Sequence, residues 1–316
     1  MKIALIVPCY KVKRHISSVL KAVGPEITKI YVVDDACPEG TGQFVREQCN
    51  DSRIVVLTHG RNQGVGGALV TGYRQAILDG MTVVVKIDGD GQMDTSVLAH
   101  FINPILEGKA DYTKGNRFFE LEGLAQMPRM RLFGNALLSF INKLASGYWS
   151  VMDPTNGFTA IHVKVLKRLP LDKIEKRYFF ECDMLFRLNT VRALVLDIPL
   201  VARYGDEVSN LRISHVALSF PNKFLNRFLK RIFYNYFLRD FSAGSIEILS
   251  GLIFLVSGTV YGVYHWYSSY IHETQTPTGS VMLAALPVLI GFQFLISALN
   301  FDVYSTPRLC LHELLD

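Results

Sequence analysis

The stretch TVVVKIDGDGQ, residues Thr82–Gln92, joins an apolar run of strand length to two aspartates that one glycine separates. Valine and isoleucine favour strands, and a run without alternating polar residues is typical of a strand buried on both faces. Asp88 and Asp90 follow at the carboxyl end of that run. The stretch therefore predicts a strand of a parallel sheet that carries two carboxylates at its end.

The same pattern extends from Lys2 to about Tyr112. Apolar runs of strand length alternate with helix-length amphipathic segments, and the helices are expected near Ile16–Val23, Phe44–Cys49 and Ala68–Leu78. This alternation predicts an α/β, Rossmann-like layer with a mostly parallel sheet covered by helices on both faces. Ligands of such sheets bind at the carboxyl ends of the strands. The polar residues expected there are Tyr10, Asp34, Asp35, Arg61 and Asp88.

The composition narrows the class of protein. The chain has 316 residues, of which 49% are hydrophobic and 19% charged, and this is too apolar for disorder and slightly apolar for a wholly soluble protein. The net charge of +5 is too small to require a nucleic-acid partner. The five cysteines are odd in number and lack zinc-knuckle or redox spacing, so reduced thiols are expected. The N-terminal run lacks the features of a secretory signal, which predicts a cytosolic start.

Two segments without charged residues near the C-terminus predict membrane spans. They are Ile248–Tyr264 and Val281–Asn300. At about 1.5 Å per residue, the second covers about 30 Å, the thickness of the hydrocarbon core, and the first does so once Ile246 and Trp266 are included. The loop between them contains no Lys or Arg, whereas the segment before them is rich in both. The positive-inside rule therefore predicts that both termini are cytoplasmic.

A basic, aromatic-rich segment precedes these spans. No acidic residue occurs between Val208 and Arg239. The six cations of this stretch are Arg212, Lys223, Arg227, Lys230, Arg231 and Arg239. Such a segment is typical of an amphipathic helix at an anionic membrane surface, and an ordinary solvated helix is the alternative. The expected organisation is a catalytic domain over 1–212, interface helices over 213–244, a transmembrane hairpin over 245–302 and a cytoplasmic tail over 303–316.

The polar residues after the central strand are suited to binding a cation. Asp88, Asp90 and Gln92 offer oxygen atoms, which Mg²⁺ and Mn²⁺ prefer as ligands. A simple Asp-Gly turn is the alternative. The glycines of the NQGVGG segment, Gly64, Gly66 and Gly67, fit neither a dinucleotide fingerprint nor a Walker A loop, so they predict close packing of a loop against a helix.

Seven blocks, taken in order, resemble the inverting glycosyltransferases of family 2, which have a GT-A fold. Within that family the chain is similar to the polyprenyl-phosphate sugar synthases of the dolichol-phosphate mannose synthase type. The blocks are VPCYK (7–11), VVDDACPEGT (32–41), NQGVGGALVTGY (62–73), DGDGQ (88–92), GNRF (115–118), DPTNGFTA (153–160) and the paired C-terminal apolar helices. The resemblance covers essentially the whole chain.

The resemblance implies a nucleotide-sugar donor and a divalent cation. Pro8, Tyr10 and Asp35 would line the nucleoside pocket, with the carboxylate accepting the base N–H. Asp88 would contact the ribose or diphosphate, and Asp90 with Gln92 would hold the metal, to which Asp88 is a further candidate ligand. Independently of the resemblance, a nucleoside diphosphate leaving group needs neutralisation, and Mg²⁺ or Mn²⁺ supplies it.

The acceptor side is expected to carry arginines, because guanidinium binds phosphate bidentately. Arg117 and Arg131 match positions where the family has arginines. Arg203, with Ser209 downstream, resembles an Arg-x-x-Gly-x-Ser block but departs from it, because two extra residues separate Gly205 from Ser209.

The candidate catalytic residues are Asp90, Asp153 and Glu181. A general base is needed when the nucleophile is an alcohol. A phosphate monoester has a second pKa of about 6 and is already largely an anion at pH 7, so Asp153 and Glu181 would then position rather than deprotonate the acceptor. Alternatively, Glu181 and Asp183 anchor a buried helix.

The leading prediction is inverting transfer of a hexose from a nucleotide sugar, with a UDP-sugar favoured, to polyprenyl phosphate at the cytoplasmic leaflet, as in a bacterial inner membrane. The expected partners are the nucleotide sugar, polyprenyl phosphate and membrane lipids. The alternatives are transfer to a hydroxyl of a lipid-linked glycan, a sugar-phosphate nucleotidyltransferase and a non-enzymatic membrane scaffold. The sequence leaves open the sugar, the choice between Mg²⁺ and Mn²⁺, and homo-oligomer formation.

Overall fold

The computed structural model describes residues 1–119, 129–200 and 213–315, with the backbone alone for 129–131 and 213–219. The chain forms two compact units, which are described separately. The first comprises Met1–Phe228 together with Pro307–Asp316, and the second comprises Leu229–Thr306.

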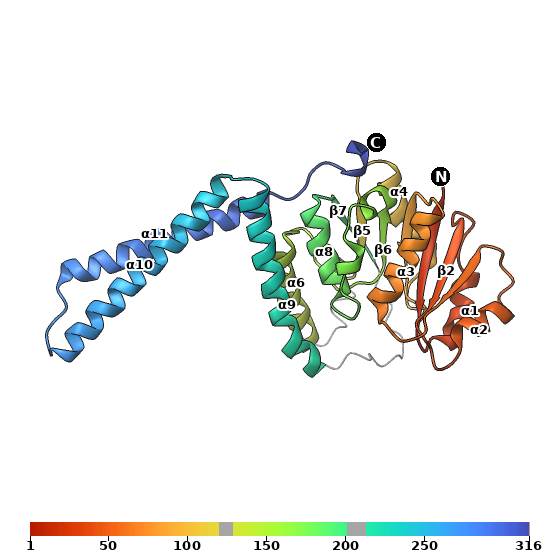
Figure 1. The fold of residues 1–316 in the computed structure, drawn as a ribbon, viewed down its shortest axis with the longest axis horizontal. Coiled ribbons are helices and arrows are strands. Elements are labelled where there is room, and N and C mark those ends of the chain that lie inside the picture. The colour runs from red at the N-terminus through yellow and green to blue at the C-terminus, as the bar shows by residue number, and fades with distance from the viewer. Residues whose placement is uncertain (120–128, 201–212, 316) are drawn as a thin grey trace. The chain divides into compact units, whose positions relative to one another are not determined.

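The first unit is built on a seven-stranded sheet with the order β3-β2-β1-β4-β6-β5-β7 (Figure 1). The strands are β1 (Ile3–Cys9), β2 (Lys29–Asp34), β3 (Ile54–Thr58), β4 (Val83–Lys86), β5 (Tyr112–Asn116), β6 (Thr159–His162) and β7 (Val195–Pro199). Only β6 runs antiparallel to its neighbours. The predicted mostly parallel α/β sheet is therefore confirmed.

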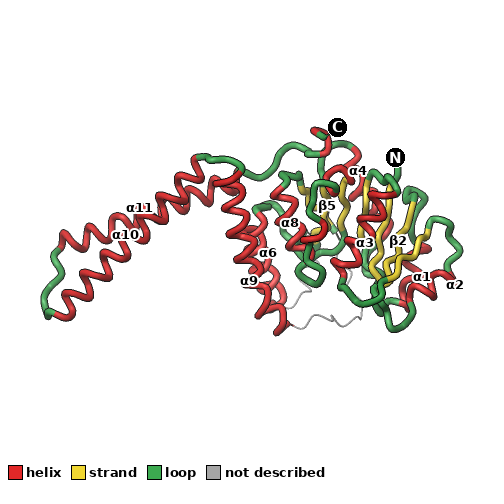
Figure 2. Tube along the Cα trace, in the orientation of Figure 1, coloured by secondary structure: helices red, strands yellow, loops and turns green. Residues whose placement is uncertain are grey.

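Helices cover both faces of this sheet (Figure 2). They are α1 (Lys13–Lys21), α2 (Thr41–Gln48), α3 (Val65–Leu78), α4 (Leu98–Leu106), α6 (Arg129–Ser146), α7 (Val163–Leu166) and α8 (Phe180–Thr190). One apolar core lies against α3, α7 and α8, and the other against α1, α2 and α4. In β4, Val84 belongs to the first core while Val83 and Val85 belong to the second. The strand is thus buried on both faces, as its unbroken apolar run predicts.

The glycines at the start of α3 allow close packing, as predicted. Gly64 has a left-handed φ of 87°. A Cβ atom at Gly64 or Gly66 would collide with the backbone carbonyl oxygen of Lys176 or Glu175, respectively. The N–H of Gly66 instead donates to the Lys176 carbonyl at 2.9 Å. These glycines therefore serve the contact between a loop and a helix.

The basic segment forms α9 (Ile213–Phe233), and several of its described side chains contact the sheet unit. Phe220 and Phe224 are buried against Phe179, with ring centroids 5.1 and 4.9 Å away. Lys223 pairs with Glu175 at 2.9 Å, and Arg227 pairs with Asp183 at 2.6 Å. Part of α9 therefore belongs to the first unit, and these two cations neutralise buried or half-buried carboxylates.

The second unit contains two long apolar helices, α10 (Ala243–Ile271) and α11 (Thr278–Tyr304). Both are long and apolar enough to cross a membrane, and 11% of each apolar window is buried. Gly251 and Gly258 of α10 lie where a Cβ would press on the backbone of α11, so the helices pack closely. At the base of this pair, Arg231 binds Asp302 at 2.6 Å, and Tyr236 also donates to that carboxylate. Two candidate membrane spans are thus present, each longer than its predicted apolar run.

Candidate active site

The described candidate residues gather at the carboxyl ends of the parallel strands. Tyr10 follows β1, Asp35 follows β2, Asp88 follows β4 and Arg117 follows β5. Because β6 is antiparallel, its beginning lies at the same end, and the loop that carries Asp153 leads into it. This is the end at which parallel α/β sheets bind ligands.

The DGDGQ turn presents its oxygen atoms beyond the end of β4. Gly91 has a left-handed φ of 79°, which allows the chain to turn back. The N–H of Gln92 donates to Oδ1 of Asp90 at 3.0 Å. Oδ1 of Asp88 lies 2.7 Å from Nζ of Lys86, so a cation would compete with an ammonium group for this carboxylate. The oxygen donors fit Mg²⁺ or Mn²⁺, and Asp90 with Gln92 fits that role better than Asp88 does.

Lys86 itself is buried at the end of β4, with 2% of its side chain exposed. Burial lowers the pKa of this ammonium group, but Asp88 and Glu181 outweigh burial and leave the pKa raised. Its Nζ lies 3.8 Å from Oε1 of Glu181, on the first turn of α8. Burial raises the pKa of Glu181, and the nearby lysines oppose that shift. Lys86 thus joins Asp88 to Glu181, and the sequence analysis did not include it.

On the nucleoside side of the candidate site, Asp35 is engaged by neighbouring backbone and side-chain groups. Asp35 is 3% exposed, and its carboxylate accepts hydrogen bonds from the N–H groups of Gln63 and Gly64 at 2.8 and 2.7 Å. His59 Nδ1 lies 2.7 Å from the same carboxylate. A carboxylate with these partners holds the turn before α3. Pro8 and Tyr10 remain accessible, and Tyr10 is 45% exposed.

Arg117 and Asp153 form a bidentate ion pair. Nε of Arg117 lies 2.7 Å from Oδ2 of Asp153, and an Nη2 contact to Oδ1 measures 3.0 Å. Asp153 is 1% exposed, whereas a third of the Arg117 side chain is exposed. The charge of Asp153 therefore orients Arg117, which fits the positioning role predicted for a phosphate acceptor.

The structure separates the two acidic residues of FFECDM. Asp183 is fully buried, accepts from the Glu175 N–H at 2.9 Å and pairs with Arg187 and Arg227. It anchors α8, which was the structural alternative. Glu181 instead faces Lys86. The side chains of Arg131, Arg203 and Ser209 lie outside the described residues.

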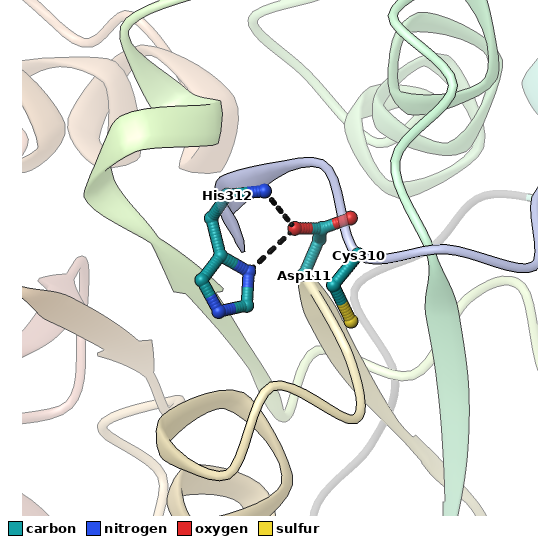
Figure 3. A group of neighbouring side chains, drawn as sticks. All are labelled: Asp111, Cys310 and His312. Carbon is teal, nitrogen blue, oxygen red and sulfur yellow. Dashed lines mark hydrogen bonds and ion pairs between the residues drawn. The ribbon is translucent and has the colours of Figure 1, made fainter. Parts of the chain in front are cut away.

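A second polar cluster lies at the opposite, amino end of the strands (Figure 3). Asp111, just before β5, accepts hydrogen bonds from the backbone N–H groups of Leu194, Leu311 and His312 and pairs with Nδ1 of His312 at 2.6 Å. The His162 ring stacks on that of His312, with centroids 4.2 Å apart. The expected cytoplasmic tail is therefore docked on the catalytic unit.

Asp111, Cys310 and His312 also have the chemistry of a metal-ligand set, with their ligand atoms within 4.8 Å of one another. Two ligands of a tetrahedral zinc, each about 2.0–2.2 Å from the metal, lie about 3.4 Å apart. The 2.6 Å between Nδ1 of His312 and Oδ1 of Asp111 is instead a hydrogen-bond distance. Burial raises the pKa of the Cys310 thiol to about 11. The hydrogen bonds from the N–H groups of Leu311 and His312 to Asp111 make the cluster an anchor for the tail.

Comparisons with known proteins identify the family of this chain. Residues 4–169 match the model of Glycosyl transferase family 2. The UDP-N-acetylglucosamine–dolichyl-phosphate N-acetylglucosaminyltransferase of Methanococcus voltae is 28% identical over 69% of this chain and 92% of its own length. The undecaprenyl-phosphate mannosyltransferase of Micrococcus luteus is 27% identical over 63% of this chain and 83% of its own length.

Solved structures share the fold. Glucosyl-3-phosphoglycerate synthase of Mycobacterium tuberculosis, in complex with Mn²⁺ and uridine diphosphate, superposes with a TM-score of 0.54 and 18% identity over 73% of this chain and 79% of that one. The GT-A-like architecture is therefore present here. Because the family model matches more than half of the sequence, the chain belongs to glycosyl transferase family 2 and is a glycosyltransferase.

Proposed function

We propose that this enzyme transfers a hexose from a nucleotide sugar to polyprenyl phosphate, with inversion at the anomeric carbon. The observation that carries the proposal is the Arg117–Asp153 pair, which holds a guanidinium group at the end of β5, at the same end of the sheet as the oxygen ligands of the DGDGQ turn. A fixed guanidinium suits an anionic acceptor. Relatives named as dolichyl- and undecaprenyl-phosphate sugar transferases support the same substrate class.

The donor is proposed to lie across β1 and β4. Pro8 and Tyr10 would contact the nucleoside, for which uridine is favoured, and Asp88 would contact the ribose or diphosphate. Asp90 and Gln92 would hold Mg²⁺ or Mn²⁺, which neutralises the charge of a departing diphosphate. Asp35 would act indirectly, by holding the turn between β3 and α3.

The acceptor chemistry requires no enzyme base. The second pKa of a phosphate monoester is about 6, so its oxygen is already anionic at neutral pH. That oxygen forms a bond to the anomeric carbon while the bond from this carbon to the diphosphate breaks, and one displacement inverts the configuration. Arg117 would orient the phosphate, and Arg131 and Arg203 are proposed to assist from the sequence resemblance.

The two apolar helices are proposed to anchor the enzyme in a membrane, such as the bacterial inner membrane, with both termini and the catalytic unit on the cytoplasmic side. This orientation gives access to cytosolic nucleotide sugars. It rests on the absence of Lys and Arg from the loop that joins the helices and on their abundance before α10.

The test is a donor screen with the full-length purified enzyme in detergent. Nucleotide sugars are offered with polyprenyl phosphate or with the matched polyprenol, in Mg²⁺ or Mn²⁺, and the glycolipid product is identified by mass spectrometry. We expect one donor to yield polyprenyl-phosphate hexose and the polyprenol to yield nothing. Transfer to the alcohol, or to a lipid-linked glycan but not to the phosphate, would overturn the proposal.

A further inference from the structure

Two buried lysines lie side by side beneath the candidate site. Lys86 of β4 and Lys114 of β5 both pair in register with Thr159 of β6, which lies between them. Residues directly opposite one another in a sheet point to the same face, so the two lysine side chains lie on the same face of the sheet. Lys86 is 2% exposed and Lys114 is fully buried. Two ammonium groups at this depth are costly to bury without compensating partners.

The partners of these lysines come from the candidate site. Nζ of Lys114 donates to the backbone carbonyl of Asn156, in the loop that also carries Asp153. Nζ of Lys86 lies 2.7 Å from Asp88 and 3.8 Å from Glu181. The loop closes tightly over Lys86, because a Cβ at Gly157 would collide with both the Lys86 ammonium and the Asp88 carboxylate. The Lys86–Thr159–Lys114 row across β4, β6 and β5 therefore fixes the positions of site residues on β4, on the loop before β6 and on α8.

Glu181 differs from the other buried carboxylates at this end of the sheet. Its side chain is 12% exposed. Within the described parts of the chain, no side chain donates a hydrogen bond to its carboxylate, whereas Asp35, Asp153 and Asp183 each accept several. A carboxylate can accept about four hydrogen bonds. Glu181 therefore keeps unused acceptor capacity beside Lys86.

The strand order indicates what Glu181 faces. Along the sequence of strands β1-β4-β6-β5, the proposed nucleoside contacts follow β1, the diphosphate and metal ligands follow β4, and the acceptor arginine follows β5. The hexose of the donor must lie between the diphosphate and the acceptor phosphate, which is the position of β6. Glu181 contacts the Lys86 end of the row that crosses β6. A carboxylate repels phosphate but accepts hydrogen bonds from neutral hydroxyl groups.

We propose that Glu181 is a specificity residue that accepts a hydrogen bond from one hydroxyl group of the donor hexose. Lys86 is a positioning residue, which fixes Glu181 relative to Asp88. This inference rests on the proposed function, since it takes the nucleotide sugar as the donor. It assigns a sugar-hydroxyl subsite to residues outside both the metal ligands and the acceptor arginines.

The test measures binding without an acceptor. Calorimetry on the full-length enzyme compares UDP-glucose and GDP-mannose, and each of their monodeoxy forms, with UDP and GDP alone. Loss of a hydrogen bond to a charged group weakens binding by about tenfold or more. We expect Glu181→Ala to weaken binding of the accepted sugar nucleotide by that factor and to leave the affinity for the free diphosphate unchanged. One monodeoxy donor should bind the wild-type enzyme as weakly as the intact sugar nucleotide binds Glu181→Ala. The variant should bind that monodeoxy donor no more weakly than the wild type does.

Lys86 is tested with the same ligands. Lys86→Met should lower the affinity for the intact sugar nucleotide as Glu181→Ala does. Lys86→Arg, which keeps the charge, should retain part of that affinity. Glu107→Gln serves as the matched control, because Glu107 is half-exposed and pairs with Lys109 away from the site. Thermal melting reports folding, and Glu181→Gln, which keeps one acceptor oxygen, replaces Glu181→Ala if the latter unfolds.

Two results would overturn the inference. One is that the Glu181 variants lose affinity for the sugar nucleotide and for the free diphosphate by the same factor. The other is that the removal of any single hydroxyl group from the donor lowers the affinity of the Glu181 variants as much as it lowers that of the wild type. Failure of the proposed function gives a different result, because polyprenyl phosphate would then yield no glycolipid while the binding difference between sugar nucleotide and free diphosphate persisted.

Discussion

Two buried carboxylates at opposite ends of this sheet, Asp111 and Glu181, have opposite surroundings. At the amino end of β5, Asp111 accepts hydrogen bonds from three backbone N–H groups and pairs with the His312 ring. At the carboxyl end of the neighbouring strands, Glu181 has the Lys86 ammonium at 3.8 Å and no hydrogen bond from a side chain in the described ranges. A saturated carboxylate holds chain segments together, whereas an unsaturated one is available to a ligand. The number of hydrogen bonds that a buried carboxylate accepts therefore indicates its role, structural or ligand-binding, better than its burial does.

The largest effect is expected where the carboxyl end would hold a cation. Asp90→Asn keeps the size of the side chain but removes the charge, so turnover should fall by about a hundredfold or more. The measurement is the steady-state rate of glycolipid formation, with and without EDTA. Full activity in EDTA would show that catalysis at this end of the sheet does not require a metal ion.

The next effect concerns the guanidinium at the end of β5. Arg117→Ala should raise the KM for polyprenyl phosphate by the equivalent of about 1.5–3 kcal/mol, because a charge-assisted contact is lost. The KM for the nucleotide sugar should not rise by a comparable factor. Asp153→Asn, which loosens Arg117, should shift the same constant in the same direction. Arg131→Ala should behave like Arg117→Ala. An unchanged acceptor KM in all three variants would contradict the assignment.

At the amino end the expected effect is on stability and not on turnover. Asp111→Asn replaces one acceptor oxygen by an NH₂ group that faces N–H donors, so the free energy of unfolding should fall by about 1–3 kcal/mol. The rate per folded molecule should stay at the wild-type value. Thermal melting and an activity assay at low temperature give the two readings. If turnover falls as well, the tail anchor takes part in function and the contrast between the two ends is wrong.

A smaller, pH-dependent effect is expected from the ring that stacks on His312. Burial lowers the pKa of His162 to about 4, with further contributions from His312 and Lys164. Since the unfolded chain binds this proton below about pH 6.5, stability should be unaffected above that pH and should decline as the pH falls from there towards 4. The expected loss at pH 5.5 is on the order of 1 kcal/mol. His162→Asn should flatten the melting profile over this range, and an identical slope in the variant would exclude His162 as its cause.

The sequence was informative where a single segment determines the structure. The unbroken apolar run before Asp88 predicts a doubly buried strand, and strand ends then place Tyr10, Asp35, Asp88 and Arg117 at one end of the sheet. Burial within that end could not be predicted. It depends on which donors the fold brings to each carboxylate, as the hydrogen bonds of Asp35 and Asp153 illustrate.

Non-local pairing accounts for the rest. The Lys86–Thr159–Lys114 row exists because β6 is inserted antiparallel between β4 and β5, and Asp111 meets His312 across 201 residues of sequence. One local signal was present, since a lysine at the end of the VVVK run is unusual in a strand buried on both faces. It indicated a polar partner near Asp88 without identifying Glu181.

The pH–rate profile of Glu181→Gln, with polyprenyl phosphate as acceptor, tests most directly the claim that the charges at the carboxyl end bind and position rather than deprotonate. We expect measurable turnover that rises through about pH 6, the second pKa of the acceptor phosphate, as it does in the wild type. Abolished turnover in Glu181→Gln, together with normal acceptor binding by Arg117→Ala, would contradict this claim and would identify a hydroxyl group as the acceptor.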